Sequence, residues 1–422
     1  MRKLKHGGDW AGFEAEYGTE LLDFSANISP LGLPESVKEA AQRALNTADR
    51  YPDPLCRRLC ERLSEAYEVP AAQIVCGNGA ADLIFRICGA LGPKNALLTA
   101  PDFGEYENAL RSLHCGIHVL ERREADGLFL DPECLTAMGR EADVVFLSNP
   151  NNPTGLLTER ETLLRLLDAQ ADHSGITVID ECFLEFTERP EEHSLISALQ
   201  NRPNLVILRA FTKTHAMAGL RLGYALCGSR DFAERLRNEG QPWPVSNVAQ
   251  EAGIAATEET EYVLRLRTLI SGERRRMTAA LTALGFKVVP GMANYLLFRS
   301  EDMALAEKLR GKGILIRDCS NFAGLAAGWY RTAIRTEAEN SLLLEALTDY
   351  GYTCVTPGGS FYMFPKAPGQ DAGAFCRKAM QRDLMLVPGE GFGCPAYFRI
   401  AYCVPTSRVE KSLPVFAALA GK

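Results

Sequence analysis

Five short apolar segments recur in the first half of the chain, and they constrain its fold more than any other feature. Each is three or four residues long, and the stretches between them carry apolar residues at helical spacing. Alternation of strands and helices predicts a largely parallel sheet with helices on both faces. Such sheets bind ligands at the carboxyl ends of their strands. The expected strands are Gln73–Val75, Ala96–Thr99, Val144–Leu147, Thr177–Ile179 and Leu205–Leu208, and two expected helices are Pro34–Leu45 and Glu159–Gln170.

The character of the sequence changes after about residue 260. A long charged helix is expected over Tyr262–Leu284, followed by the short strands and helices of a smaller α+β domain. The pattern that begins at Leu281 recurs from Leu347, and the offset between matching segments drifts only from 66 to 70 residues. We therefore predict two copies of one small-domain unit, which are too few for a solenoid. The expected division is an N-terminal arm (1–30), a large domain (31–260), a small domain (261–350) and a duplicated segment (351–422).

Composition excludes several classes of function. The 422 residues carry a net charge of −7 without a run of Lys or Arg, which argues against a nucleic-acid partner. No stretch approaches the roughly 20 apolar residues of a membrane helix, and residues 1–10 lack the apolar core of a signal peptide. We therefore expect a cytoplasmic protein whose 13 cysteines are reduced. Cys56 and Cys60 lie one helical turn apart, but without a second pair at zinc-finger spacing a structural role is favoured over a metal site.

A lysine and an aspartate each follow an expected strand. Lys213 comes shortly after Leu205–Leu208, and Asp180 closes the run Thr-Val-Ile-Asp. Taken alone, the lysine could be a solvated surface group and the aspartate a helix cap. Together they match two demands of pyridoxal phosphate, a lysine that binds its aldehyde and a carboxylate on its ring nitrogen. Asn152 lies in the tight turn Asn149–Gly155, from which its amide could donate to the ring oxygen.

The cofactor phosphate also has candidate ligands. The string Gly77–Asp82 follows a strand and opens a helix, so the backbone N–H groups of Gly79 and Ala80 could approach a phosphate. Arg221 would add charge-assisted hydrogen bonds, and Thr212 a hydroxyl. A bare Gly-X-Gly string is a weak signal, but its place between a strand and a helix strengthens it.

An aromatic side chain is needed against the cofactor ring, and two stand close together. Phe103 is the first candidate and Tyr106 the alternative, although either could be an ordinary core residue. Any one of these residues could be structural. All of them in this chain order, each beyond a strand end, indicate a pyridoxal-phosphate enzyme in which Lys213 carries the cofactor.

These motifs resemble those of class I and II aminotransferases of fold type I. Longer strings are similar to the threonine-phosphate decarboxylases, which are relatives of the histidinol-phosphate aminotransferases. They include Leu22-Asp-Phe-Ser-Ala-Asn-Ile-Ser-Pro, Gly291-Met-Ala-Asn-Tyr and Ile314-Leu-Ile-Arg-Asp-Cys-Ser. The resemblance implies a mostly parallel seven-stranded sheet in the large domain. It extends over roughly residues 4–350, whereas the remainder resembles the last segment of a different class I aminotransferase.

The resemblance also implies roles for individual residues. Tyr51 would reach across a homodimer interface to the cofactor phosphate of the other subunit, so that the active site is shared. His6, Asn27 and Arg317 would bind the phosphate of a phosphorylated amino-acid substrate, and Arg331 its carboxylate, as the chemistry of guanidinium groups allows. Judged without the resemblance, His6 and Arg317 would pass for surface residues. The complete implied substrate set is His6, Asn27, Asn152, Arg317 and Arg331.

Two positions depart from the common aminotransferase pattern. Phe183 stands where many members have a tyrosine that bonds the ring oxygen, although the decarboxylases also have phenylalanine there. Ala210 replaces a phosphate-binding hydroxyl, for which Thr212 compensates only in part.

The resemblance implies decarboxylation of L-threonine O-3-phosphate to aminopropanol phosphate in cobalamin biosynthesis. L-serine O-phosphate is a variant substrate, because one methyl group discriminates weakly. A histidinol-phosphate-type aminotransferase is the alternative. A ligand-sensing regulator on an inactive fold is a third interpretation, against which the intact Lys213 argues.

Overall fold

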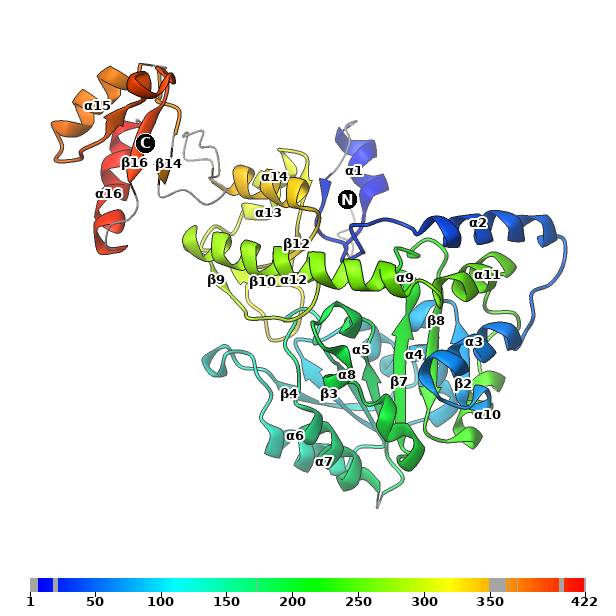
Figure 1. The fold of residues 1–422 in the computed structure, drawn as a ribbon. Helices are drawn as coiled ribbons and strands as arrows, with labels where there is room; N and C mark the ends of the chain where they lie inside the picture. Colours follow the sequence, from blue (N-terminus) through cyan, green and yellow to red (C-terminus); the bar gives the residue numbers. More distant parts are fainter. Residues whose placement is uncertain are drawn as a thin grey trace. The chain divides into compact units, whose positions relative to one another are not determined.

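The computed structural model describes residues 7–17, 22–171, 173–348, 362–363, 365–369, 371–401 and 406–420 (Figure 1). His6 and most of the start of the predicted duplicated segment lie outside these residues. The chain divides into two compact units, Met1–Ser341 and Leu342–Lys422.

The first unit is organised around a seven-stranded sheet of order β2-β8-β7-β6-β5-β3-β4. Its strands are parallel except for β8, which runs antiparallel to both of its neighbours. All five expected strands are present, so the predicted sheet is confirmed. The strands are β2 (Ile74–Gly77), β3 (Asn95–Ala100), β4 (Gly116–Glu121), β5 (Val144–Ser148), β6 (Ile176–Asp180), β7 (Leu205–Ala210) and β8 (Gly223–Cys227).

Helices cover both faces of this sheet. Alternate residues of β7 show why: Leu205 and Ile207 belong to one apolar cluster, whereas Val206 and Leu208 belong to another. A strand buried on both faces has consecutive rather than alternating apolar residues. One face packs against α2 (Glu35–Ala44), α3 (Arg57–Tyr67), α6 (Pro132–Arg140), α7 (Arg160–Ala171) and α11 (Asn247–Ala256), and the other against α4 (Gly79–Leu91), α5 (Gly104–Ser112) and α10 (Arg230–Asn238).

A long helix, α12 (Thr260–Ala283), connects the large sheet to a smaller one, as expected from the sequence. Its buried side chains recur at helical spacing along one face. The smaller sheet is antiparallel, with the order β12-β13-β10-β9, and a separate strand β11 pairs in parallel with the N-terminal β1. The strands are β1 (Leu22–Asp23), β9 (Lys287–Val288), β10 (Tyr295–Arg299), β11 (Ile314–Leu315), β12 (Arg317–Asp318) and β13 (Trp329–Ala333), and α13 covers Leu305–Arg310.

The second unit repeats this small sheet. We call strands β10, β12 and β13 with α13 copy one, and strands β14, β15 and β16 with α15 copy two. The order β14-β16-β15 reproduces β10-β13-β12, and every pair is antiparallel in both copies. The repeat predicted from the sequence is therefore a structural repeat. The elements of copy two are β14 (Tyr362–Met363), α15 (Ala372–Met380), β15 (Val387–Pro388) and β16 (Phe398–Ala401).

Cys56 and Cys60 are buried, and Cys60 Sγ lies 3.8 Å from Cys76 Sγ. Among the described residues, no helix is both long and apolar enough to span a membrane. The other helices are α1 (Trp10–Tyr17), α8 (Pro190–His193), α9 (Phe211–Thr214), α14 (Glu337–Leu347) and α16 (Thr406–Leu419).

Candidate functional site

Lys213 lies in the single helical turn α9, directly beyond the carboxyl end of β7. Its side chain is enclosed, and burial, followed by the positive charges of Arg331 and Arg221, lowers the lysine pKa to about 8. About one tenth of the amine is therefore neutral at pH 7, far more than for a lysine with the ordinary pKa. A neutral amine is the form that attacks an aldehyde.

Asp180 ends β6, the strand next to β7, which places its carboxylate on the same edge of the sheet. Oδ2 accepts a hydrogen bond of 2.8 Å from the Tyr106 hydroxyl, and Oδ1 accepts one of 2.9 Å from the backbone N–H of Cys182. Each oxygen keeps a further lone pair for another donor. The carboxylate is thus held in one orientation and can still bind a protonated ring nitrogen.

Asn152 and Arg331 come from different sheets and meet in this site. The Asn152 side-chain oxygen accepts a hydrogen bond from Arg331 Nη1, while Arg331 Nη2 donates to the Ser25 carbonyl at 3.1 Å. With its oxygen engaged, the Asn152 amide presents its NH2 group as a donor. Arg331 is buried, which lowers its pKa, and its Nε has no hydrogen-bond partner among the described residues. The guanidinium group therefore retains a free donor for an anionic ligand.

The start of α4 forms a cradle that leaves no room for side chains. A Cβ atom on Gly79 would lie 2.7 Å from Arg221 Nη2, and one on Gly223 would lie 2.5 Å from the Ala80 nitrogen. Gly79 also has a φ of +77°, which disfavours other residues. The Arg221 guanidinium thus lies against the N-terminal backbone of a 13-residue helix. This combination of backbone N–H groups and a cation fits a phosphate group. Thr212 is buried beside Lys213 on α9.

The two aromatic candidates have different surroundings. Tyr106 is buried, donates to Asp180, and stacks on Phe146 with ring centroids 5.2 Å apart. Its ring is thus part of the core, and the structure does not favour it as the ring-stacking residue. Phe103 is half-buried and packs edge-on against Tyr106 at 5.6 Å. It lines a cavity of about 440 Å³, to whose wall neither Lys213 nor Asp180 contributes.

Arg317 lies on the wall of the same cavity as Phe103. Its Nη1 donates to the Asp318 carbonyl and its Nη2 to the Asn321 side-chain oxygen, both at 2.8 Å. Burial lowers the arginine pKa, although the group stays cationic at neutral pH. A cation on a cavity wall is suited to bind an anionic group that enters the cavity.

Asn27 is buried in the N-terminal segment that runs past the site. Ser25, two residues before it, accepts from Arg331, and the backbone N–H of Ser29, two residues after it, donates to the Lys213 carbonyl at 2.9 Å. The Asn27 side-chain oxygen has no partner among the described residues. Asn27 therefore lies in the middle of a short segment that is hydrogen-bonded to Arg331 on one side and to Lys213 on the other.

Tyr51 is not part of this cluster. Its ring is 78% exposed and stacks on Trp243 with ring centroids 4.4 Å apart. Asn247 Nδ2 donates to the carbonyls of Thr47 and Arg50, which fixes the chain immediately before Tyr51. An exposed aromatic pair on a fixed loop is compatible with the implied contact to another subunit.

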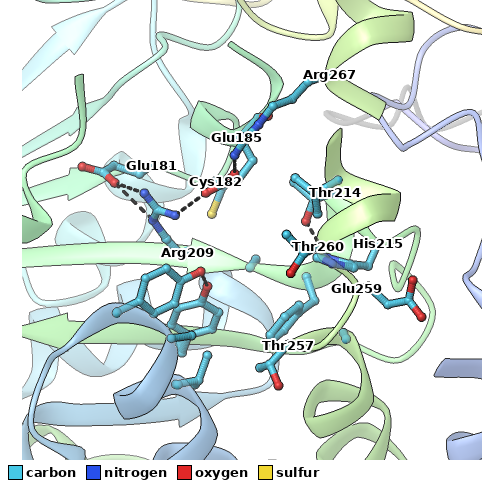
Figure 2. A pocket seen from close by; sticks show the side chains of 18 of the residues that line it. Glu181, Cys182, Glu185, Arg209, Thr214, His215, Thr257, Glu259, Thr260 and Arg267 are labelled. Atoms are coloured by element: carbon cyan, nitrogen blue, oxygen red, sulfur yellow. Dashed lines mark hydrogen bonds and ion pairs between the residues drawn. The ribbon is translucent and has the colours of Figure 1, made fainter. Parts of the chain in front are cut away.

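A second cavity of about 310 Å³, which Cys182 helps to line, was not expected from the sequence (Figure 2). Arg209 forms ion pairs with Glu181 at 2.7 Å and with Glu185 at 2.6 Å along its wall. His215 also lines this cavity, and burial lowers its pKa to about 4, so the ring is neutral. A charged residue within the apolar strand β7 was the sequence signal for this network.

A family model described as aminotransferase class I and II matches residues 19–347 and, a second time, residues 332–414. The threonine-phosphate decarboxylase of Salmonella typhimurium is 40% identical over 331 residues, which cover 78% of this chain and 90% of that protein.

Two solved structures are also similar. The histidinol-phosphate aminotransferase from Clostridium acetobutylicum is 31% identical with a TM-score of 0.72, over 77% of this chain and 97% of that chain. The L-threonine-O-3-phosphate decarboxylase from Porphyromonas gingivalis is 28% identical with a TM-score of 0.66, over the same shares of the two chains. The second family match falls on the segment that contains copy two.

Proposed function

The chain belongs to the aminotransferase class I and II family, and on that basis we propose that it decarboxylates L-threonine O-3-phosphate. The products are CO2 and aminopropanol phosphate, in which a proton replaces the carboxyl group at Cα. The cofactor is pyridoxal 5′-phosphate, which withdraws electrons from the amino-acid Cα when it is bound. Lys213 holds its aldehyde carbon, Asp180 its ring nitrogen, and Arg221 with the start of α4 its phosphate.

One observation supports a substrate that has two anionic groups. Arg317 and Arg331 face each other as paired residues of the neighbouring strands β12 and β13. Arg331 is close enough to Lys213 to lower its pKa, whereas Arg317 lies on the wall of the cavity that Phe103 also lines. These observations support Arg331 as the ligand of a carboxylate near the reacting carbon and Arg317 as the ligand of a phosphate farther out.

The way in which the protein binds these two anionic groups would determine which bond at the substrate Cα breaks. The bond at Cα that lies perpendicular to the cofactor ring is the one that breaks, because it overlaps the ring's π system. Holding the carboxylate on Arg331 and the phosphate on Arg317 leaves the substrate little rotational freedom. We propose that this hold presents the carboxyl group, rather than the hydrogen, out of the ring plane. L-serine O-phosphate would bind in the same way without one methyl group.

A histidinol-phosphate aminotransferase is the second candidate. The solved structure from Clostridium acetobutylicum supports it, since it matches this chain at 31% identity. Histidinol phosphate has a phosphate but no carboxylate. An enzyme for that substrate would therefore need Arg331 for its second, carboxylate-bearing substrate only.

A direct assay separates the two candidates. The purified protein is incubated with L-threonine O-3-phosphate, and CO2 and aminopropanol phosphate are measured. In parallel, histidinol phosphate and 2-oxoglutarate are supplied, and glutamate is measured. We expect stoichiometric CO2 and amine in the first assay. Glutamate formation without decarboxylation would reject the proposal in favour of the aminotransferase.

We further propose that the active site is shared between the subunits of a homodimer. Tyr51, held by Trp243, would contact the cofactor phosphate of the partner subunit. Mixing a Tyr51→Phe variant with a Lys213→Ala variant tests this arrangement. A shared site predicts that mixed dimers contain one site with both substitutions and one with neither, and so regain activity. A mixture without activity, although mixed dimers form, would contradict it.

A further inference from the structure

Asp102 lies in the loop after β3, directly before Phe103, and several donors converge on its carboxylate. Oδ1 accepts the backbone N–H of Phe103 at 2.8 Å and the hydroxyl of Ser148. Oδ2 accepts the hydroxyl of Thr99 at 2.5 Å. Asp102 was not singled out from the sequence, where an aspartate after a proline passes for an ordinary turn residue.

Ser148 extends these contacts to the loop on the neighbouring strand. It ends β5, and its hydroxyl oxygen accepts the backbone N–H of Asn152 at 3.0 Å and the side-chain NH2 of Asn151 at 3.3 Å. A continuous path of hydrogen bonds therefore runs from the Phe103 backbone through Asp102 and Ser148 to the Asn152 backbone. The path joins the backbones of Phe103 and Asn152, which lie 49 residues apart in the sequence. A separate hydrogen bond from Asn151 Nδ2 to the Pro101 carbonyl, at 3.1 Å, also joins their two loops.

A buried cation interacts electrostatically with the Asp102 carboxylate. Arg122 is 2% exposed, and its Nε and Nη2 have no hydrogen-bond partner among the described residues. Burial raises the pKa of Asp102 to about 6, and the charge of Arg122 opposes this rise, as do the three hydrogen bonds. The other titratable groups that interact with Asp102 are Tyr106 and Tyr295, and burial raises the pKa of both. Asp102 is thus an anion at pH 7 and above.

The ionised form is the one that this geometry requires. A carboxylate has only acceptors, so it can receive these three donors and also the backbone N–H of Ser148, which donates to Oδ2 at 3.5 Å. An amide in its place would turn an NH2 group toward one or more of these donors, and a buried donor would lose its partner. Asp143, at the other end of β3, shows the contrast. Its carboxylate also accepts two backbone N–H groups, of Lys94 and Asn95, but it connects no residue of the site.

We propose that Asp102 is a positioning residue that holds Phe103, the candidate for contact with the cofactor ring face, and Asn152, the candidate donor to the ring oxygen, in fixed relation to each other. The inference rests on the roles proposed above for Phe103 and Asn152, but not on the substrate. Asp102 acts through other residues, so its loss should change the ring environment and the turnover more than it changes cofactor attachment.

The test compares four variants of the full-length holoenzyme. Asp102→Asn should lower kcat about tenfold or more, shift the visible absorbance of the bound cofactor, and leave KM within about threefold. Ser148→Ala breaks the path to Asn152 and should reproduce most of this effect. Thr99→Val removes a donor that lies outside the path, and Asp143→Asn is the matched control at the far end of the strand. Both should change kcat less than about threefold.

Two further readouts separate positioning from a role in folding. The melting temperatures of the apoproteins show whether each variant folds. In the wild type, acidification through about pH 6 should produce the spectral shift of Asp102→Asn, and that shift should be missing from the variant. A wild-type spectrum and kcat in Asp102→Asn would overturn the inference. So would a folded, inactive Asp102→Asn beside a fully active Ser148→Ala.

The same experiment distinguishes this inference from the proposed function. The absorbance of the bound cofactor is measured without substrate. One outcome is that the protein does not decarboxylate threonine phosphate while Asp102→Asn and Ser148→Ala still shift the cofactor absorbance more than the two controls do. That result would reject the proposed function and support the role of Asp102.

Discussion

Copy one and copy two have the same three strands in the same order, yet among the described residues only copy one pairs two arginines across neighbouring strands. In copy one Arg331 pairs with Arg317, and in copy two Arg399 pairs with Val387 in the equivalent register. One cation is thus retained and the other is replaced by an apolar residue. The duplication has preserved the scaffold without preserving the site.

The surroundings of the two copies differ as much as their residues. Arg331 is buried against Asn152 and the N-terminal segment, whereas the Arg399 guanidinium lies 4.8 Å from the ring of Phe392. Copy one is extended by β11, which pairs with β1. The corresponding residues of copy two include Met385, which is 84% exposed and lies outside any strand. A small domain becomes part of a site through the contacts that the N-terminal segment and the large sheet make with it.

The largest expected effect separates the two equivalent arginines. Arg331→Ala should weaken substrate binding by roughly ten- to a hundredfold, because hydrogen bonds to a charged group contribute about 1.5–3 kcal/mol. Arg399→Ala should leave binding unchanged. Titration of the holoenzyme with L-threonine O-3-phosphate, followed by the cofactor absorbance, measures both. If Arg399→Ala abolishes binding and Arg331→Ala does not, copy two forms the site and the assignment is wrong.

A smaller effect is expected at the position where the copies differ. Arg317→Ala should weaken binding of threonine phosphate about tenfold, and binding of unphosphorylated threonine much less. Val387→Ala, the matched change in copy two, should affect neither ligand. The ratio of the two dissociation constants is the measurement. An equal loss for both ligands would show that Arg317 does not bind the phosphate.

Removal of copy two should have a modest effect. We propose that residues 351–422 fold outside the catalytic pocket, so a chain that ends after Tyr350 should keep kcat/KM within about threefold. Exposure of an apolar surface could cause aggregation, and the soluble fraction must therefore be isolated first. A soluble, cofactor-bound and inactive truncated protein, together with loss of activity in Arg399→Ala, would place copy two in the site.

Sequence patterns predicted the large sheet because its central strands are buried on both faces. Thr177–Ile179 and Leu205–Leu208 appeared as continuous apolar runs, and the structure lengthens them by only a few residues. Two strands were missed for physical reasons. The edge strand β4 is mostly exposed and contains a histidine. Strand β8 begins at Gly223, only two residues after the candidate phosphate ligand Arg221, and the glycines on either side of that arginine were typical of a loop.

The candidate site was predictable residue by residue but not as a network. Lys213 and Asp180 are identifiable because they follow strands, whereas the meeting of Asn152 with Arg331 joins positions 179 residues apart. Sequence also could not decide between Phe103 and Tyr106. They are three residues apart, and only the bond from Tyr106 to Asp180 shows which ring lies in the core. The path through Asp102 depends on the adjacency of β3 and β5, which no local pattern reveals.

The smallest expected effect is electrostatic, and it tests whether Arg331 acts on Lys213 itself. In the apoprotein the lysine pKa is lowered to about 8, with burial as the largest cause and Arg331 as the next. Only the neutral amine reacts with the cofactor aldehyde. The rate of attachment should therefore rise as the pH increases through about 8 and level off above it.

Arg331→Ala removes a cation that disfavours the protonated amine, so the lysine pKa should rise toward its ordinary value. The midpoint of the pH–rate profile should then move upward by a fraction of a pH unit, because burial and Arg221 still act on Lys213. Arg399→Ala in copy two should not move it. The measurement is the rate of borohydride-reducible attachment of pyridoxal phosphate to apoprotein between pH 6 and about pH 10, a range that spans the lowered pKa and approaches the ordinary lysine value. A downward shift in Arg331→Ala, or an equal shift in both variants, would show that copy one does not supply the charge that acts on Lys213.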